Sequence, residues 1–152
     1  MKENEELLHR ELTGKIIGAF YEVYKTLGYG FLEKVYKNAM VLELRRIGLR
    51  VVAQKRLRVY YGDQIVGDYF ADLVVEGLVI VEIKAAVALN EAFVAQLQNY
   101  LKATEIEVGL LMNFGPEPAF QRKAFSNDRK KIRHTLLNTD NPNNADAAEQ
   151  RG

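Results

Sequence analysis

The segment LVIVEIK, residues 78–84, constrains the fold more than any other part of the chain. Residues 78–81 and Ile83 are all apolar, so a strand built from them is apolar on both faces and has to be covered on both sides. Two charged residues, Glu82 and Lys84, nevertheless stand at its end. Burying an uncompensated charge costs on the order of several kcal/mol, so this pattern predicts a functional role for the pair.

Length and composition predict a single domain without a membrane span. The chain has 152 residues, 48% of them hydrophobic and 27% charged, and no apolar run is long enough to cross a bilayer. The acidic, polar start, MKENEELLHRE, is unlike a secretory signal. Because there is no cysteine, disulfides and thiolate metal sites are excluded, and we expect a cytoplasmic location.

The net charge of +1 gives little whole-molecule attraction to a polyanion, so nucleic-acid binding would need a local basic patch. We predict that the phosphate groups of a nucleic acid are bound by six basic residues: Arg45, Arg46, Arg50, Lys55, Arg56 and Arg58. A second cluster is RKKIRH, residues 129–134. The alternative, that these residues only form solvated faces of a helix, a strand and a tail, is equally compatible with the sequence.

Hydropathy periods and turn residues divide the chain into elements. They predict helices over 4–27, 31–47 and 89–104, the last capped by Asn90, strands over 49–61, 65–76 and 106–114, and a short edge strand at 120–125. The strands over 49–61 and 65–76 and the strand within 78–84 form an antiparallel meander. A right-handed crossover through the third helix then makes the 106–114 strand parallel to its neighbour. We therefore expect an α/β fold with a mixed sheet between helices. Residues 1–137 form its domain, and the polar residues 138–152 are expected to be disordered.

A second carboxylate, Asp72, lies in the strand before the opening segment, one hairpin away from Glu82. A two-residue loop at Glu76-Gly77 would turn the two acids to opposite faces. A three-residue loop, with Gly77 in the left-handed conformation, pairs Val75 with Val79 and aligns Asp72 with Glu82. We predict this loop, or a bulge with the same effect.

Two aligned carboxylates beside Lys84 predict a site for Mg²⁺ or Mn²⁺, which prefer oxygen ligands and retain several waters. Lys84 would orient or help deprotonate a metal-bound water, which suits phosphodiester cleavage. The alternative is an ordinary half-exposed Glu-x-Lys pair. That reading is favoured when the motif stands alone, and less so with a second acid one hairpin away.

Three further residues are candidates for the same site. Gln96 and Tyr100 are four apart, on one face of the predicted helix that leaves the Lys84 end of the strand, and they either brace the site or belong to the core and its rim. Glu33 lies at the edge of the second helix's apolar stripe, and its alternative role is a solvated i,i+4 pair with Lys37.

The motifs GFLEKVY (with Gly30, Glu33 and Tyr36), DYFADLVVE, VIVEIKA, QLQNYL and GLLMNFG occur in the order seen in the GxxExxY family, and the chain resembles that family over residues 10–126. The family is placed in the PD-(D/E)xK nuclease superfamily. The resemblance implies a restriction-endonuclease-like αβββαβ core. In it Asp72, Glu82 and Lys84 are the signature residues, Glu33 is the helix-borne acid, and Gln96 and Tyr100 form the Q-x-x-x-Y pair. Many members carry histidine at the positions of Tyr24 and Phe93, which this chain lacks.

The leading hypothesis is a Mg²⁺-dependent nuclease that acts on DNA. Asp72, Glu82 and the Ile83 carbonyl would hold the metal, Lys84 would position water, and Glu33 would bind a second metal through water. The alternative is a non-catalytic module that keeps the nuclease fold and binds nucleic acid or protein. A chain that acts only in an obligate complex, such as a homodimer, is a third possibility that the sequence leaves open.

Overall fold

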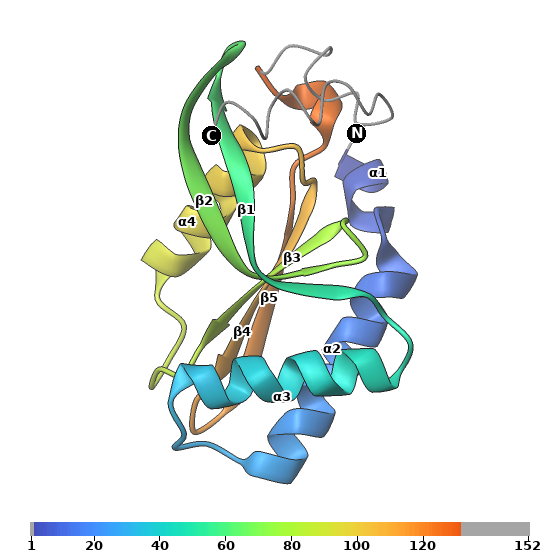
Figure 1. Ribbon diagram of the computed structural model, residues 1–152, viewed down its shortest axis with the longest axis vertical. Helices are drawn as coiled ribbons and strands as arrows, with labels where there is room; N and C mark the ends of the chain where they lie inside the picture. The colour runs from blue at the N-terminus through green and yellow to red at the C-terminus, as the bar shows by residue number, and fades with distance from the viewer. Residues whose placement is uncertain (1, 132–152) are drawn as a thin grey trace.

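The computed structural model describes residues 2–131, which form three layers (Figure 1). In chain order the elements are α1 (Lys2–Leu7), α2 (Arg10–Leu27), α3 (Glu33–Arg46), β1 (Val51–Tyr61), β2 (Gln64–Val75), β3 (Val79–Lys84), α4 (Glu91–Ala103), β4 (Val108–Phe114), β5 (Pro118–Ala124) and a 3₁₀ turn at Asn127–Arg129. The expected tail at 138–152 lies outside the described residues. None of the helices within 2–131 is long and apolar enough to cross a membrane.

The five strands form one mixed sheet in the order β1-β2-β3-β4-β5. All neighbouring pairs are antiparallel except β3 and β4, which α4 connects and which run parallel. The predicted mixed sheet and crossover are therefore confirmed. The predicted edge strand at 120–125 is also present, as β5, which begins two residues earlier and pairs with β4.

Both faces of β3 are buried, as its sequence predicts. Val79, Val81 and Ile83 pack with residues of α2 and α3, whereas Ile80 packs on the opposite face with Leu97 of α4. Because apolar side chains alternate between the two clusters, the strand needs helices on both sides of the sheet.

The helix predicted over residues 4–27 is divided in two. His9 adopts a left-handed backbone conformation (φ 53°), which ends the helical run between α1 and α2. Carbonyls left free near the end of α1 are bound from β5, because the Arg122 guanidinium donates to the oxygens of Glu5 (3.0 Å) and Leu8 (2.5 Å). Periodicity alone could not reveal this break, since the apolar spacing continues across it.

The connection between β2 and β3 has the predicted three-residue loop. Val75 pairs with Val79, and Gly77 is left-handed (φ 68°). Glu76 is also left-handed (φ 55°), and its carboxylate accepts a hydrogen bond from the backbone N–H of Arg50 (2.5 Å). This anchored loop sets the register of the whole hairpin.

The segment after β3 is tied to the end of β4. The side chain of Asn113, which is 1% exposed, accepts from the Ala86 N–H (2.8 Å) and donates to the Ala86 carbonyl (3.0 Å). A Cβ on Gly115 would lie 2.2 Å from that same carbonyl oxygen, so only glycine allows the approach. The chain leaving Lys84 is thereby held in place.

We expect Gly115→Ala to destabilise the protein by about 1–3 kcal/mol, because the added methyl group overpacks against a backbone atom. The matched control is Gly14→Ala, in α2, where a Cβ meets nothing within 4 Å. That change should leave stability equal or raise it by up to about 1 kcal/mol. Thermal unfolding of the two variants measures the difference, and equal melting temperatures would contradict the close approach.

Candidate active site

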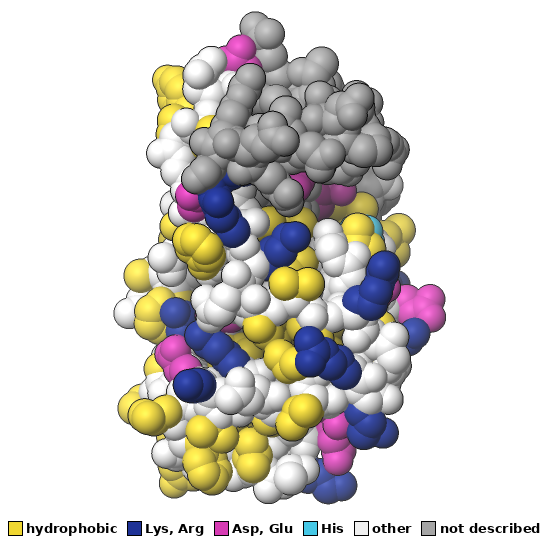
Figure 2. Space-filling model, in the orientation of Figure 1, with side chains coloured by type: hydrophobic (Ala, Val, Ile, Leu, Met, Phe, Trp, Pro, Cys, Tyr) yellow, Lys and Arg dark blue, Asp and Glu magenta, His cyan; other side chains and the backbone are white. Residues whose placement is uncertain are grey.

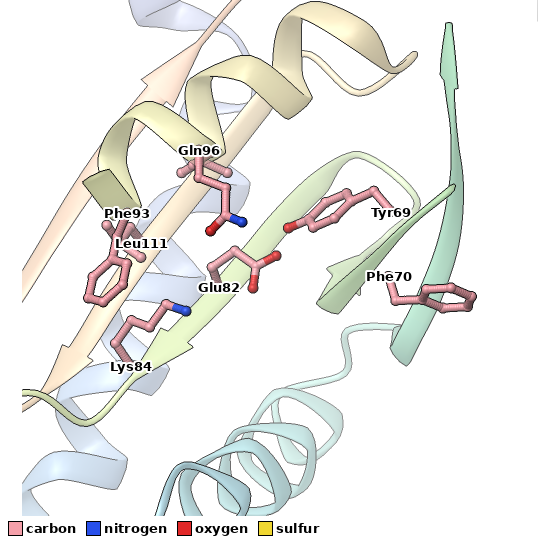
Figure 3. A pocket seen from close by; sticks show the side chains of 8 residues that line it. Tyr69, Phe70, Glu82, Lys84, Phe93, Gln96 and Leu111 are labelled. Atoms are coloured by element: carbon pink, nitrogen blue, oxygen red, sulfur yellow. The ribbon is translucent and has the colours of Figure 1, made fainter. Parts of the chain in front are cut away.

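Glu82 and Lys84 project from the end of β3 into a hollow of about 190 Å³ between the sheet and α4 (Figure 3). The residues that line it are Tyr69, Phe70, Glu82, Lys84, Phe93, Gln96, Leu97 and Leu111. In the close view the Lys84 ammonium and the Gln96 amide both point toward the Glu82 carboxylate. The charged end of the strand therefore faces an accessible pocket rather than the closed core.

The environment of Glu82 opposes its ionisation. Burial raises the pKa of Glu82 to about 7, while Lys84, a hydrogen bond from the Asp72 backbone N–H and Lys37 act in the opposite direction. The charge of Glu33 raises the same pKa. Within the described residues, Glu82 Oε1 is buried and has no hydrogen-bond partner. A buried carboxylate oxygen without a partner is unusual, and an ordered water or an ion usually satisfies it.

Lys84 is held from the side opposite Glu82 by an aromatic ring. Its ammonium nitrogen lies 4.6 Å from the centroid of the Phe93 ring, which comes from the first turn of α4. This cation–π contact keeps the side chain extended along the pocket. Phe93 therefore holds the lysine at the edge of the hollow.

Asp72 lies beside Glu82, but the side chain departs from regular strand alternation. Ala71 and Val74 both pack on the α4 side although they are three residues apart, and the β1 residue facing Asp72, Gln54, is left-handed (φ 53°). The Asp72 side chain consequently reaches toward the end of β3. Its Oδ2 accepts from the Ile83 N–H (2.8 Å), and its Oδ1 lies 2.9 Å from Lys37 Nζ.

The predicted convergence is thus assembled in part. The three-residue loop brings Asp72 and Glu82 next to each other, yet Asp72 is not among the residues that line the hollow with Glu82 and Lys84. Lys37, which the alternative interpretation of Glu33 made its i,i+4 partner, pairs with Asp72. Glu33 itself is exposed in the first turn of α3.

Gln96 and Tyr100 take different positions on α4. Gln96 lines the hollow, whereas Tyr100 stacks on Tyr69 of β2, with ring centroids 3.7 Å apart and an interplanar angle of 10°. A second hollow continues along α4 and shares Phe93 and Gln96 with the first. Tyr100 therefore braces β2 against α4 at the rim of the site.

The predicted phosphate-binding residues come from two elements and the segment between them. Arg45 and Arg46 lie in the last turn of α3, whereas Lys55, Arg56 and Arg58 lie on β1. Four of the six pair with carboxylates: Arg46 with Glu43, Arg50 with Glu76, and both Arg56 and Arg58 with the single carboxylate of Asp68. On the face shown in Figure 2 the basic side chains are scattered among apolar ones.

The sequence did not assign three residues of the site to it: Lys37, Tyr69 and Phe93. Tyr69 had a usable signal, because it lies three residues before Asp72 in a strand already assigned to the site. Lys37 had none, since its contact joins α3 to β2 across 35 positions of sequence. Phe93 was noted only as a departure from the family pattern.

The donors available for a cation are oxygen atoms. Among residues 2–131 no cluster of three or more acidic, histidine or cysteine side chains is placed to hold a metal ion. One unpaired carboxylate oxygen at Glu82 with a second acid beside it fits Mg²⁺ or Mn²⁺, which take one or two carboxylates and complete their shell with water. It does not fit zinc, which is held by several nitrogen or sulfur ligands.

A mixed sheet with the αβββαβ order and an Asp, Glu and Lys set at the ends of neighbouring strands defines a nuclease-type fold. A family model described as the PD-(D/E)XK nuclease superfamily matches residues 10–124, and the chain belongs to that superfamily. No curated protein matches the chain. The crystal structure of SSO0001 matches with 18% identity and a TM-score of 0.46 over 61% of this chain, and the match spans half of that chain's length.

We expect the raised pKa of Glu82 to make stability fall with pH when no divalent cation is present. Between about pH 4.5 and 7 the unfolded chain releases this proton while the folded protein keeps it, so folding is progressively disfavoured. The Glu82→Gln variant has no such proton. Urea unfolding in EDTA should therefore show wild type losing stability relative to Glu82→Gln across this range, by about 1.4 kcal/mol for each pKa unit. A difference in unfolding free energy between the two proteins that does not change with pH would contradict the raised pKa of Glu82.

Proposed function

We propose that the protein is a metal-dependent nuclease that hydrolyses phosphodiester bonds in DNA. The observation that carries the proposal is the Glu82 carboxylate beside the Lys84 ammonium in the hollow, with one buried oxygen, Oε1, that has no hydrogen-bond partner among residues 2–131. Membership of the PD-(D/E)XK superfamily supports a nuclease activity. A cytoplasmic location and a homodimer remain predictions from the sequence.

Within the superfamily we assign the chain to the GxxExxY group. Gly30 has φ 110°, a conformation that favours glycine, and the Tyr36 hydroxyl donates to the Gly28 carbonyl (2.6 Å) while its ring stacks on Phe114 (4.2 Å). The glycine and the tyrosine thus fix the start of α3. Glu33, the middle residue of the motif, is left exposed and close enough to act on the pKa of Glu82.

In this proposal Asp72, Glu82 and the Ile83 carbonyl hold Mg²⁺ or Mn²⁺, and Glu33 reaches a second ion through water. The N–H of Ile83 points to Asp72, and because the N–H and carbonyl of a strand residue point to the same edge, the carbonyl faces β2 as well. When bound, the cation supplies Lewis-acid stabilisation of charge on the phosphate. Lys84 orients the attacking water and helps remove its proton, and Gln96 and Tyr100 keep α4 and β2 in place.

The decisive experiment is cleavage of linear and circular DNA, and of RNA, with Mg²⁺ or Mn²⁺. We expect Lys84→Ala to lower the rate at least about 10²-fold, the usual contribution of a positioned acid–base group. The control is Lys15→Ala on α2, a lysine half exposed and paired with Glu11, which should cleave like wild type. Asp72→Asn should lose activity as well.

A different result would point to the alternative function. If wild type binds nucleic acid without metal and never cleaves it, and if Asp72→Asn binds equally well, the protein is a binding module that keeps the nuclease fold. Cleavage that persists unchanged in Lys84→Ala would contradict the assigned site.

For the basic residues we expect phosphate binding to depend steeply on salt. Removing one phosphate contact should lower the slope of log affinity against log salt concentration by about 1. Lys55→Ala tests a residue of β1, and Arg45→Ala tests the end of α3; neither has a carboxylate among the ion pairs above. Fluorescence anisotropy with a labelled duplex, in EDTA so that nothing is cleaved, measures the slope. An unchanged slope in both variants would remove these residues from the interface.

A further inference from the structure

Lys37, in the middle of α3, contacts the site although no part of the nuclease signature includes it. Its Nζ lies 2.9 Å from Asp72 Oδ1, and the two side chains are 25% and 14% exposed. The other Asp72 oxygen accepts from the Ile83 N–H. Both oxygens of this acid therefore have partners inside the protein.

The neighbouring acid is in the opposite situation. Glu82 Oε1 has no hydrogen-bond partner among the described residues, and both Lys84 and Lys37 act on the carboxylate electrostatically. Glu82 can therefore accept a cation, whereas Asp72 is already paired with the ammonium group of Lys37. The ammonium comes from a helix, on the face of the sheet opposite α4.

We infer that Lys37 is a positioning residue whose ammonium group occupies the place on Asp72 Oδ1 that a divalent cation takes, so that metal and lysine compete for this oxygen. The inference rests on the proposed function. When the metal is absent, Lys37 neutralises a mostly buried carboxylate and keeps it directed toward β3. When the metal binds, Lys37 has to release Oδ1, while the Ile83 N–H continues to hold Oδ2.

Removing the ammonium should therefore strengthen metal binding. Oδ1 is then free, and the repulsion between the lysine and the incoming cation disappears. We expect Lys37→Met to bind Mn²⁺ about tenfold more tightly than wild type, since two like charges a few ångströms apart repel appreciably even in water.

The matched control is Lys34→Met. Lys34 lies one turn earlier on the same helix and is exposed, so this variant removes the same charge without touching Asp72. Its Mn²⁺ affinity should remain within about twofold of wild type, because exposed charges are screened. Isothermal titration calorimetry of the metal-free proteins with Mn²⁺ alone gives the three affinities, and circular dichroism in EDTA shows that each variant is folded.

A second measurement is made on the unmodified protein and needs a variant only to assign the signal. The side-chain ¹⁵N signal of the Lys37 ammonium group, assigned by its loss in Lys37→Arg, should shift as Mg²⁺ is added, and the shift should saturate with the calorimetric affinity. The signal of Lys34 should stay in place.

Equal or weaker Mn²⁺ binding by folded Lys37→Met, or an unmoved Lys37 signal at saturating Mg²⁺, would overturn the inference. Absence of Mn²⁺ binding in all three proteins would overturn it too, because freeing Asp72 should have exposed a site. Tighter binding by Lys37→Met in a protein that cleaves no nucleic acid would support the competition and contradict the nuclease activity, so the two proposals can fail separately.

Discussion

The structure depends on the burial of β3 on both faces. A strand that is apolar on both sides needs helices above and below the sheet, and α2 with α3 on one side and α4 on the other provide them. The same burial gives the site its chemistry. Glu82 lies on this buried strand. Burial therefore disfavours the ionised form of its carboxylate, and a nearby positive charge stabilises that form.

The carboxylates of Asp72 and Glu82 are stabilised by different groups. Lys37 pairs with Asp72 directly, whereas among the described residues Glu82 is stabilised by the charges of Lys84 and Lys37 and by a backbone hydrogen bond from Asp72. Three carboxylates, counting Glu33, share the region with two ammonium groups. A divalent cation would bring the balance to a small positive charge, which is the sign that a phosphodiester requires.

Much of this arrangement could be predicted from the sequence because local rules decided it. The Glu76-Gly77-Leu78 loop has a glycine where a left-handed residue is needed, and that choice set the register of Asp72 and Glu82. The order of elements followed from hydropathy periods and turns. The break at His9 and the irregularity at Gln54 could not be predicted, because both are non-glycine residues in the left-handed conformation, which such residues rarely adopt. Asp72 lies across from the irregularity at Gln54, and its lysine partner comes from a distant helix.

The charged residues of β1 have a consequence for the behaviour of the protein at high concentration. β1 is an edge strand, with its outer row of backbone groups unpaired within the sheet, and exposed apolar side chains such as Phe70 and Val66 lie on the neighbouring β2. A long edge strand of this kind invites strand addition from other molecules. Arg56, paired with Asp68, and the exposed Lys55 place charges on that edge, and a register shift at Val59/Tyr60 interrupts its regularity. These charges and this irregularity oppose the addition of further strands and so reduce aggregation, independently of any ligand that the arginines bind.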